Sequence, residues 1–301
     1  MQYAFVGLGA LGQHLAANLA RGGFNVTVHD LRREAAALAL EAGARWGDSI
    51  PQLARACDGF ITCLPSPSAS SAVLAAALAD LKPGAVWIEM STNDVATIET
   101  LASKASVARI HTLVCPVTGG VHRAASGEIT ILVGGEQQIY SAHRPALAAM
   151  GGRLVYLGGR EQAAVTKVVT NMLAFVHLIA AGEALMLCAK AGVDLSAAYE
   201  AIRHSSGNSF VHETESQLIL NGSYDIDFTM DLACKDAGFA LEFGRRYGVP
   251  LRLAAEMEQI FLEGRARFGG GAWSTMIVKL LEDTVGRTLR APGFPPKLTD
   301  G

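Results

Sequence analysis

Residues 3–30, YAFVGLGALGQHLAANLARGGFNVTVHD, contain the pattern that decides the fold. A short apolar run leads into a Gly-x-Gly-x-x-Gly element at residues 7–12, and an amphipathic stretch with helical spacing follows at residues 11–21. A second apolar run, residues 25–29, then ends at Asp30. This order predicts a strand, a tight turn, a helix and a second strand, which is the start of a parallel sheet with helical crossovers.

The glycines of this element suit the binding of a dinucleotide. Gly7 permits the tight turn, Gly9 lets the backbone approach a pyrophosphate, and Gly12 allows close packing of helix on strand. An isolated pattern of this kind is often only a glycine turn, but here a strand precedes it and a helix follows it. We therefore predict a cofactor-binding loop made of Gly7, Leu8, Gly9, Ala10, Leu11 and Gly12.

Asp30 stands eighteen residues beyond Gly12, at the end of the second predicted strand. The fingerprint places an acidic residue there, where it accepts hydrogen bonds from the adenosine ribose. A carboxylate repels a 2′-phosphate, which favours NAD as the cofactor. Arg32 and Arg33 follow within reach and leave NADP possible, although both arginines also fit the solvated first turn of the next helix.

The rest of the chain predicts two domains. Short apolar runs alternate with alanine-rich helical stretches up to about residue 160, which predicts a mostly parallel, doubly wound α/β sheet of the Rossmann type in a domain of residues 1–160. The predicted strands are 3–6, 25–29, 59–64, 85–89, 112–114, 129–133 and 154–157. From residue 161 the apolar residues recur at helical spacing, so residues 161–301 are predicted to form an all-α domain for substrate binding and dimerisation.

A long helix, residues 161–191, is predicted to join the two domains, with Gly192 as its C-terminal stop. Its stretch without formal charge, residues 168–182, is short for a bilayer span of roughly 20 residues, which favours a buried helix and predicts no membrane partner. Further helices are predicted at 195–203, 228–247, 251–267 and 274–290.

Composition excludes several classes of protein. Hydrophobic residues make up 50% of the 301 residues and charged residues 18%, which describes a globular chain with a core rather than a disordered one. The formal net charge is −3, so no global positive field favours nucleic acid as a partner. The five cysteines are scattered without a Cys-x-x-Cys pair, which favours reduced thiols, a cytoplasmic protein and no structural metal site.

Polar side chains and turns follow other predicted strands, where ligands of open α/β sheets bind. Leu64 and Pro65 follow one strand, and Ser91 with Thr92 follows the next, so we predict Leu64, Pro65 and Thr92 as further cofactor contacts. Ser91 or Thr92 is equally suited to cap the following helix, and the two roles are compatible.

Two groups of residues suit substrate chemistry. Lys167 and Asn171 lie four apart on the long helix among apolar neighbours. Burial disfavours the charged form of a lysine and would let it exchange a proton with an alcohol near neutral pH; a lysine whose stem lies on the apolar surface and whose head reaches solvent is the alternative. Residues 115–120, CPVTGG, offer a hydroxyl and two backbone amides to a carboxylate, or form an ordinary glycine turn.

Taken together, the motifs resemble those of the β-hydroxyacid dehydrogenase family, which includes 3-hydroxyisobutyrate dehydrogenase and tartronate semialdehyde reductase and is related to 6-phosphogluconate dehydrogenase. The ordered motifs that carry the resemblance across nearly the whole chain are residues 6–30, EMST at 89–92, CPVTGG at 115–120, GEITILVGG at 127–135, KVVTN at 167–171 and KDAGFA at 235–240.

The resemblance implies hydride transfer between a nicotinamide cofactor and a small β-hydroxy acid. It implies Lys167 as the general acid/base and Asn171 as a hydrogen-bonding partner of the substrate. It further implies that Thr118, Gly119 and Gly120 hold the carboxylate and that Lys235 lies near the nicotinamide.

Some positions depart from the family pattern. Thr118 replaces a common serine, and Thr170 replaces the first of two asparagines. His122, Arg123, Phe239 and Trp273 are candidates for the substrate pocket, although an aromatic residue such as Phe239 is more often part of the core.

Two alternatives stay open at this point: an imine reductase-like NADPH enzyme, in which lysine is typically replaced at the proton-donor position, and a non-catalytic dinucleotide-binding sensor. The apolar long helix also predicts a homodimer or homotetramer, because subunit packing is one way to cover it.

Overall fold

The computed structural model describes residues 1–298. The chain forms two compact units, the first covering Met1–Lys167 and the second beginning at Val168. The division lies inside the long helix, which starts at Arg160. The sequence pattern changes at the start of that helix, whereas the compact units separate about two turns later. The reason is that the first turns of the helix pack on the first unit, where Ala163 lies against Gly134.

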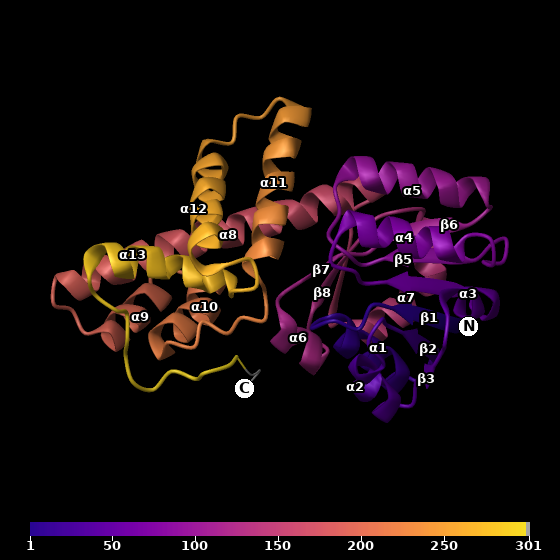
Figure 1. Ribbon diagram of the computed structural model, residues 1–301, viewed down its shortest axis with the longest axis horizontal. Coiled ribbons are helices and arrows are strands. Elements are labelled where there is room, and N and C mark those ends of the chain that lie inside the picture. Colours follow the sequence, from indigo (N-terminus) through magenta and orange to yellow (C-terminus); the bar gives the residue numbers. More distant parts are fainter. Residues whose placement is uncertain (299–301) are drawn as a thin grey trace. The chain divides into compact units, whose positions relative to one another are not determined.

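A parallel sheet forms the centre of the first unit (Figure 1). Within the described residues it has six strands in the order β3-β2-β1-β4-β5-β6. They are β1 (Gln2–Val6), β2 (Asn25–His29), β3 (Arg45–Trp46), β4 (Gly59–Thr62), β5 (Val86–Glu89) and β6 (His111–Val114). The chain runs from β1 to one side and later returns to β4 on the other, so the strand order reverses between β1 and β4. The predicted doubly wound sheet is confirmed, with β3 as an edge strand that the sequence did not predict.

Both faces of this sheet are covered because successive side chains of a strand point to opposite faces. On β1, Tyr3 and Phe5 belong to one buried cluster, while Ala4 and Val6 belong to another. The covering helices are α1 (Gly12–Arg21), η1 (Arg33–Ala36), α2 (Ala37–Glu41), α3 (Ile50–Ala56), α4 (Pro67–Ala77) and α5 (Val95–Val107).

A smaller sheet completes the first unit. Its strands are β7 (Val117–Thr118), β8 (Thr130–Val133) and β9 (Arg153–Tyr156), with β7 antiparallel and β9 parallel to β8. The accompanying helices are α6 (Val121–Ser126) and α7 (Gln137–Met150). The sequence predicted β8 and β9 within a residue, but it missed β7 and gave no sign that these strands leave the main sheet.

The long helix α8 (Arg160–Lys190) is confirmed, and its end is set by Gly192, which has a φ of +79°. By length and composition α8 is the one helix among the described residues that is apolar enough to cross a membrane. Part of that apolar character has a structural cause, because Phe175, Leu178 and Leu185 belong to the core of the second unit. Core helices of soluble proteins pass the same test.

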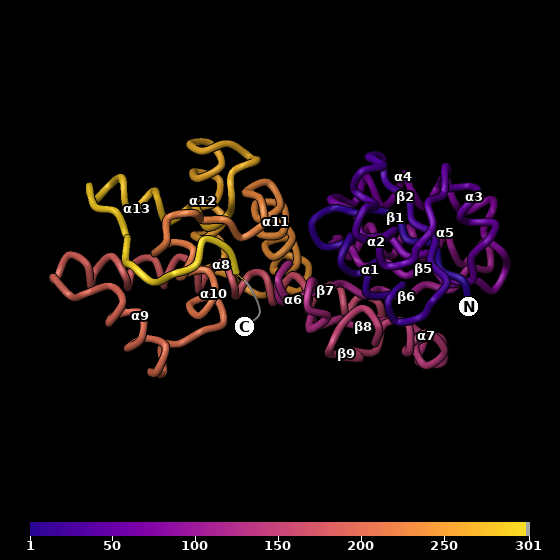
Figure 2. Tube along the Cα trace, turned by 90° about the horizontal axis from the view of Figure 1, so that it is seen from below, coloured from indigo at the N-terminus to yellow at the C-terminus, as the bar shows by residue number. Residues whose placement is uncertain are grey.

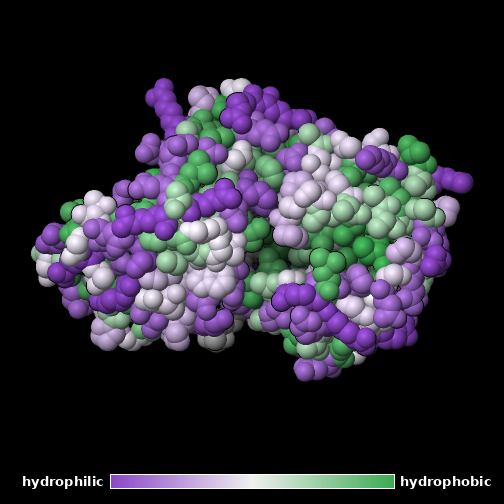
Figure 3. Space-filling view, in the orientation of Figure 1, coloured by the Kyte–Doolittle hydropathy of each residue, from purple (hydrophilic) through white to green (hydrophobic). Residues whose placement is uncertain are grey.

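The second unit is helical. Beyond α8 it contains α9 (Leu195–Arg203), α10 (Phe210–Asn221), α11 (Met230–Tyr247), α12 (Arg252–Phe268), η2 (Ser274–Ile277) and α13 (Val278–Val285). Figures 1 and 2 show α11 and α12 side by side as an antiparallel pair. Arg245 and Arg246 lie in the last turn of α11, next to the exposed turn that leads to α12, and Figure 3 shows hydrophilic residues gathered at this end of the pair.

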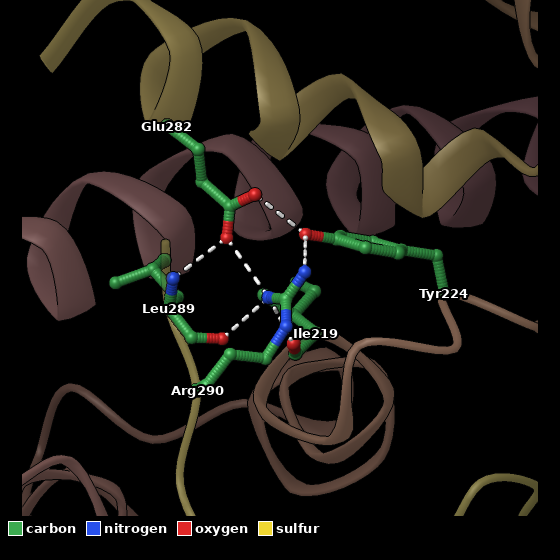
Figure 4. Close-up of polar contacts among 5 residues, drawn as sticks. All are labelled: Ile219, Tyr224, Glu282, Leu289 and Arg290. Carbon is green, nitrogen blue, oxygen red and sulfur yellow. Dashed lines mark hydrogen bonds and ion pairs between the residues drawn. The ribbon is translucent and has the colours of Figure 1, made fainter. Parts of the chain in front are cut away.

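The single helix predicted at 274–290 is wrong. It begins as the 3-10 turn η2, and α13 ends at Gly286, whose φ is +66°. Buried Glu282 of α13 then binds the chain that follows: its Oε1 accepts from the Leu289 backbone N–H at 2.7 Å and from Arg290 at 3.0 Å (Figure 4). Its Oε2 accepts from the hydroxyl of Tyr224 at 2.6 Å. These bonds replace helical ones and hold the C-terminal segment against the helices.

Candidate active site

The glycine loop lies at the carboxyl end of β1, and its three glycines have different surroundings. Gly7 has a φ of +97°, and a Cβ there would collide with the carbonyl oxygen of Cys63. A Cβ on Gly12 would collide with the carbonyl oxygen of Gly7. Nothing lies within 4 Å of a Cβ built on Gly9, which faces open space. The loop thus leaves room at Gly9, where the fingerprint brings a pyrophosphate close to the backbone.

Asp30 lies beside this loop at the carboxyl end of β2. Its Oδ2 accepts from the Leu8 N–H at 2.7 Å, and its Oδ1 accepts from the Arg32 N–H at 2.9 Å. A carboxylate has about four acceptor positions, so these bonds leave capacity for ribose hydroxyls. The Leu8 side chain is buried, with an exposed fraction of 1%, and serves the loop through its backbone.

Arg33 faces a different partner. Its guanidinium lies over the ring of Trp46, 5.5 Å from the centroid. This aromatic contact holds a positive charge near the strand end that carries Asp30.

The loops after β4 and β5 are joined to each other. The Leu64 N–H donates to Ser91 Oγ at 2.7 Å, and the Ser91 N–H donates to Oε1 of Glu89 at 2.7 Å. Glu89 has an exposed fraction of 0%, and Thr62 Oγ1 donates to its other oxygen at 3.0 Å. Burial raises the pKa of the Glu89 carboxyl, and the hydrogen bonds from Ser91 and Thr62 act against that rise.

Sequence reasoning passed over Glu89, although it lies inside the motif at 89–92. Nothing in its local pattern showed that its carboxyl would be buried between two strand ends. Its contacts fix the segments that carry Leu64, Pro65 and Thr92, so these predicted cofactor contacts lie at the same edge of the sheet as Gly7–Gly12 and Asp30.

The first unit therefore places every predicted cofactor residue except Lys235 at the carboxyl ends of β1, β2, β4 and β5, on both sides of the point where the strand order reverses. Its residues fit a dinucleotide, because the opening at Gly9 and the acceptor Asp30 match the two parts of the fingerprint. This arrangement defines a dinucleotide-binding protein of the doubly wound class.

The turn after β7 carries the predicted carboxylate-binding residues. Thr118 ends β7 and pairs with Thr130, and the next two residues, Gly119 and Gly120, have φ of +128° and +91°. These values favour glycine. Two basic side chains lie against the turn: a Cβ on Gly119 would be 3.2 Å from Cδ of Arg123, and one on Gly120 would be 2.9 Å from the ring of His122.

The two predicted site residues of α8, Lys167 and Asn171, lie in its N-terminal half. Lys167 has an exposed fraction of 8%, and Val168 beside it is fully buried. Asn171 follows one turn later and is half-buried. On one helix, residues four apart lie on the same face.

A third residue joins Asn171 to Lys235 in the second unit. Asp236, on α11, has an exposed fraction of 2%. Its Oδ2 accepts from Nδ2 of Asn171 at 2.6 Å, and its Oδ1 accepts from Nζ of Lys235 at 2.6 Å. Lys235 also lies 4.9 Å from the ring centroid of Phe239. Sequence reasoning named Asn171 and Lys235 but missed Asp236, whose only sign was its place in the KDAGFA motif.

Comparison with known proteins agrees with this arrangement. Residues 2–158 match the model of the NAD binding domain of 6-phosphogluconate dehydrogenase. Residues 162–281 match the family described as NAD-binding of NADP-dependent 3-hydroxyisobutyrate dehydrogenase.

Individual relatives cover almost the whole chain. An L-threonate dehydrogenase of Cupriavidus necator is 35% identical over 279 residues, 91% of this chain and 94% of that protein. A 2-(hydroxymethyl)glutarate dehydrogenase of Eubacterium barkeri is 31% identical and covers 95% of this chain and 96% of its own. The crystal structure of a 3-hydroxyisobutyrate dehydrogenase from Salmonella typhimurium superposes with a TM-score of 0.86 at 26% identity, over 93% of this chain and 99% of that one.

The chain belongs to the β-hydroxyacid dehydrogenase family of NAD(P)-dependent oxidoreductases. The predicted family is confirmed, and with it a nicotinamide dinucleotide as cofactor.

Proposed function

We propose that this protein interconverts a small β-hydroxy acid and its semialdehyde by transferring a hydride to or from NAD(P), with Lys167 as the general acid/base. The observation that carries the proposal is the burial of Lys167 on α8, one turn before Asn171. Lys167 has an exposed fraction of only 8%, and its neighbours along α8 are mostly apolar. A lysine held largely out of water in this way is suited to exchange a proton with a substrate alcohol. A solvated lysine would lack this property.

The proposed mechanism gives each residue one task. A bound nicotinamide supplies the hydride acceptor or donor. In oxidation the neutral amine of Lys167 takes the proton of the substrate hydroxyl as the C–H bond breaks, and in reduction it returns that proton to the oxygen. Asn171 hydrogen-bonds the substrate.

Thr118, Gly119 and Gly120 would hold the carboxylate of the substrate. In this arrangement the domain of residues 1–160 supplies the cofactor site and the carboxylate contacts, while the domain of residues 161–301 supplies the other substrate contacts and dimerisation. The resemblance to the family assigns Lys235 to the nicotinamide end of the site.

For the cofactor we propose a preference for NAD. Asp30 accepts from the loop itself and presents a negative charge where NADP carries its 2′-phosphate. Arg33 is placed over Trp46 and supplies a smaller opposing effect.

For the assembly we propose a homodimer or homotetramer in the cytoplasm. Helix α8 exposes Leu173 and Leu187, with exposed fractions of 47% and 73%, and packing of a second subunit is one way to cover them.

The test is a panel of acids with both cofactors, followed by the absorbance of the reduced nicotinamide. The panel holds L-threonate, 2-(hydroxymethyl)glutarate and 3-hydroxyisobutyrate, the acids named for the relatives. We expect turnover of at least one acid and a loss of about 10²-fold or more in kcat for Lys167→Ala, the usual scale of general acid/base catalysis. Cofactor affinity should stay nearly unchanged.

Two results would contradict the proposal. Near-wild-type kcat in Lys167→Ala would remove the lysine from the mechanism. Tight cofactor binding with no turnover of any small hydroxy acid would favour a non-catalytic sensor.

A further inference from the structure

Asp236 lies on α11, and its carboxyl is buried. Among the described acidic residues of α11, it is the one that binds two other polar side chains. Oδ1 accepts from Lys235, its neighbour along the chain, and Oδ2 accepts from Asn171, which is 65 residues away on α8. The Lys235 side chain is also largely buried, with an exposed fraction of 19%. A buried carboxylate therefore connects two residues that the proposed function uses, and it does so across two helices.

The bond from Asn171 determines the orientation of its carboxamide. An ionised carboxylate only accepts hydrogen bonds, whereas the two ends of an asparagine amide differ: Nδ2 donates and Oδ1 accepts. A flipped amide would place Oδ1 against Oδ2 of Asp236, two acceptors at hydrogen-bond distance. Asp236 therefore excludes the flipped state and fixes the directions in which Asn171 presents its carbonyl oxygen and its second N–H.

Lys235 holds the other oxygen of Asp236, because its Nζ lies 2.6 Å from Oδ1. A positive partner at this distance compensates a buried negative charge. Lys235 and Asp236 thus act together on the amide of Asn171.

We propose that Asp236 is a positioning residue: it sets the amide of Asn171 so that this side chain offers its carbonyl oxygen and second N–H to the substrate in one fixed arrangement. The inference rests on the proposed function, because it gives Asn171 a substrate to bind. Asp236 itself touches Asn171 and Lys235, and its effect on turnover passes through Asn171.

A merely structural role has a distinct signature, and the same helix offers a matched control. Asp231 of α11 pairs with Arg265 on α12, and both side chains are about half exposed. Exposed pairs of this kind contribute little to stability. Asp231→Asn removes one carboxylate from α11 by the same chemical change as Asp236→Asn, without reaching Asn171.

The experiment is a double-mutant cycle of Asp236→Asn and Asn171→Ala, with kcat, KM for the acid and the thermal unfolding midpoint measured for each protein. The carboxamide that Asp236→Asn introduces has one acceptor oxygen and cannot serve both partners. We expect Asp236→Asn to lower kcat by roughly tenfold or more in the wild-type background and by less than about twofold in Asn171→Ala, a non-additivity typical of residues in direct contact. Asp231→Asn should leave kcat unchanged.

A shift of the unfolding midpoint does not separate the two roles, but the coupling in kcat does. An equal loss of kcat in both backgrounds would overturn the inference, since Asp236 would then act without Asn171. If Asp236→Asn does not fold, Asp236→Glu takes its place: it keeps the charge but moves it by one methylene, and its loss of kcat must likewise vanish in Asn171→Ala.

Lys167→Ala in the same series distinguishes the two proposals. Wild-type turnover in that variant contradicts the proposed function itself. A large loss in Lys167→Ala together with additive Asp236 and Asn171 effects contradicts only the positioning role.

Discussion

The glycine loop of the first unit and the Asp236 cluster of the second unit reach a defined geometry by different means. In the loop, close backbone packing sets the geometry, because neither Gly7 nor Gly12 has room for a Cβ. In the cluster, side chains do the work, because Asp236 joins Asn171 and Lys235 through two hydrogen bonds of 2.6 Å. Substitutions in the loop should therefore act by steric collision with the backbone. Substitutions in the cluster should act by removing a charge or a hydrogen-bond partner.

The largest effect is expected at Gly12. In Gly12→Ala the new Cβ meets the carbonyl oxygen of Gly7, and backbone has to move. We expect a loss of about 1–3 kcal/mol or more in the free energy of unfolding, the usual cost of overpacking, together with loss of cofactor binding. Chemical denaturation and a cofactor titration measure the two effects. A stable variant with normal cofactor affinity would contradict the packing argument.

Gly9→Ala sharpens the comparison within the same loop. A Cβ at Gly9 meets nothing within 4 Å, so the free energy of unfolding should change by no more than about 0.5 kcal/mol, as for surface substitutions. The methyl group would occupy the space through which the pyrophosphate approaches. We expect the Kd for the cofactor to rise about tenfold or more, which corresponds to about 1.4 kcal/mol. Unchanged cofactor affinity would mean that the dinucleotide does not approach this loop.

A smaller effect is expected from Asp30→Asn. The amide oxygen can still accept from the Leu8 N–H, so the loop keeps this bond, while the negative charge and the acceptor of the Arg32 N–H disappear. We expect the ratio of NADP to NAD affinity to rise by about tenfold, or roughly 1.4 kcal/mol. The two Kd values, measured side by side, give the answer. An unchanged ratio would show that residues other than Asp30 determine the preference for NAD over NADP.

The most gradual effect concerns Glu215 of α10, because it is spread over several pH units. Burial raises the pKa of Glu215 from 4.5 to about 8. The unfolded chain loses this proton at lower pH than the folded chain, so the free energy of unfolding should fall as pH rises from about 4.5 to about 8. This group contributes a slope of at most about 1.4 kcal/mol per pH unit.

Glu215→Gln should remove that part of the pH dependence and make the protein more stable than the wild type near pH 8. Denaturation curves of both proteins, recorded between pH 5 and pH 8 at intervals of about one pH unit, measure this difference in the free energy of unfolding. Parallel pH profiles for the two proteins would show that Glu215 ionises normally in the fold.

Local patterns predicted most of the fold because their information lies within a few residues. The strand at 25–29 was predicted to the residue, and the glycine after α8 was sufficient to locate its end. Helix α10 was missed, since its middle residues HETESQ interrupt the apolar period and Ser209, its N-cap, follows a run that resembles a loop. Strand β3 has two residues and no period to detect.

Polar residues within one local motif could be predicted from the sequence, whereas polar contacts between different elements could not. Gly7, Gly12 and Asp30 form a pattern of fixed spacing, which made the glycine loop and the acidic residue beside it predictable. The bonds from Asn171 to Asp236 and from Thr62 to Glu89 join residues on different elements, and no spacing rule predicts them. The side chains that support a site are therefore found only when the fold is known.

The most direct test of the central claim is a single-turnover measurement of hydride transfer in the wild type and in Lys167→Ala, both with the cofactor bound before the acid is added. This isolates the chemical step from product release. The account predicts that the rate falls by about 10²-fold or more while the Kd of the cofactor is unchanged. Equal rates of hydride transfer in the two proteins would contradict it.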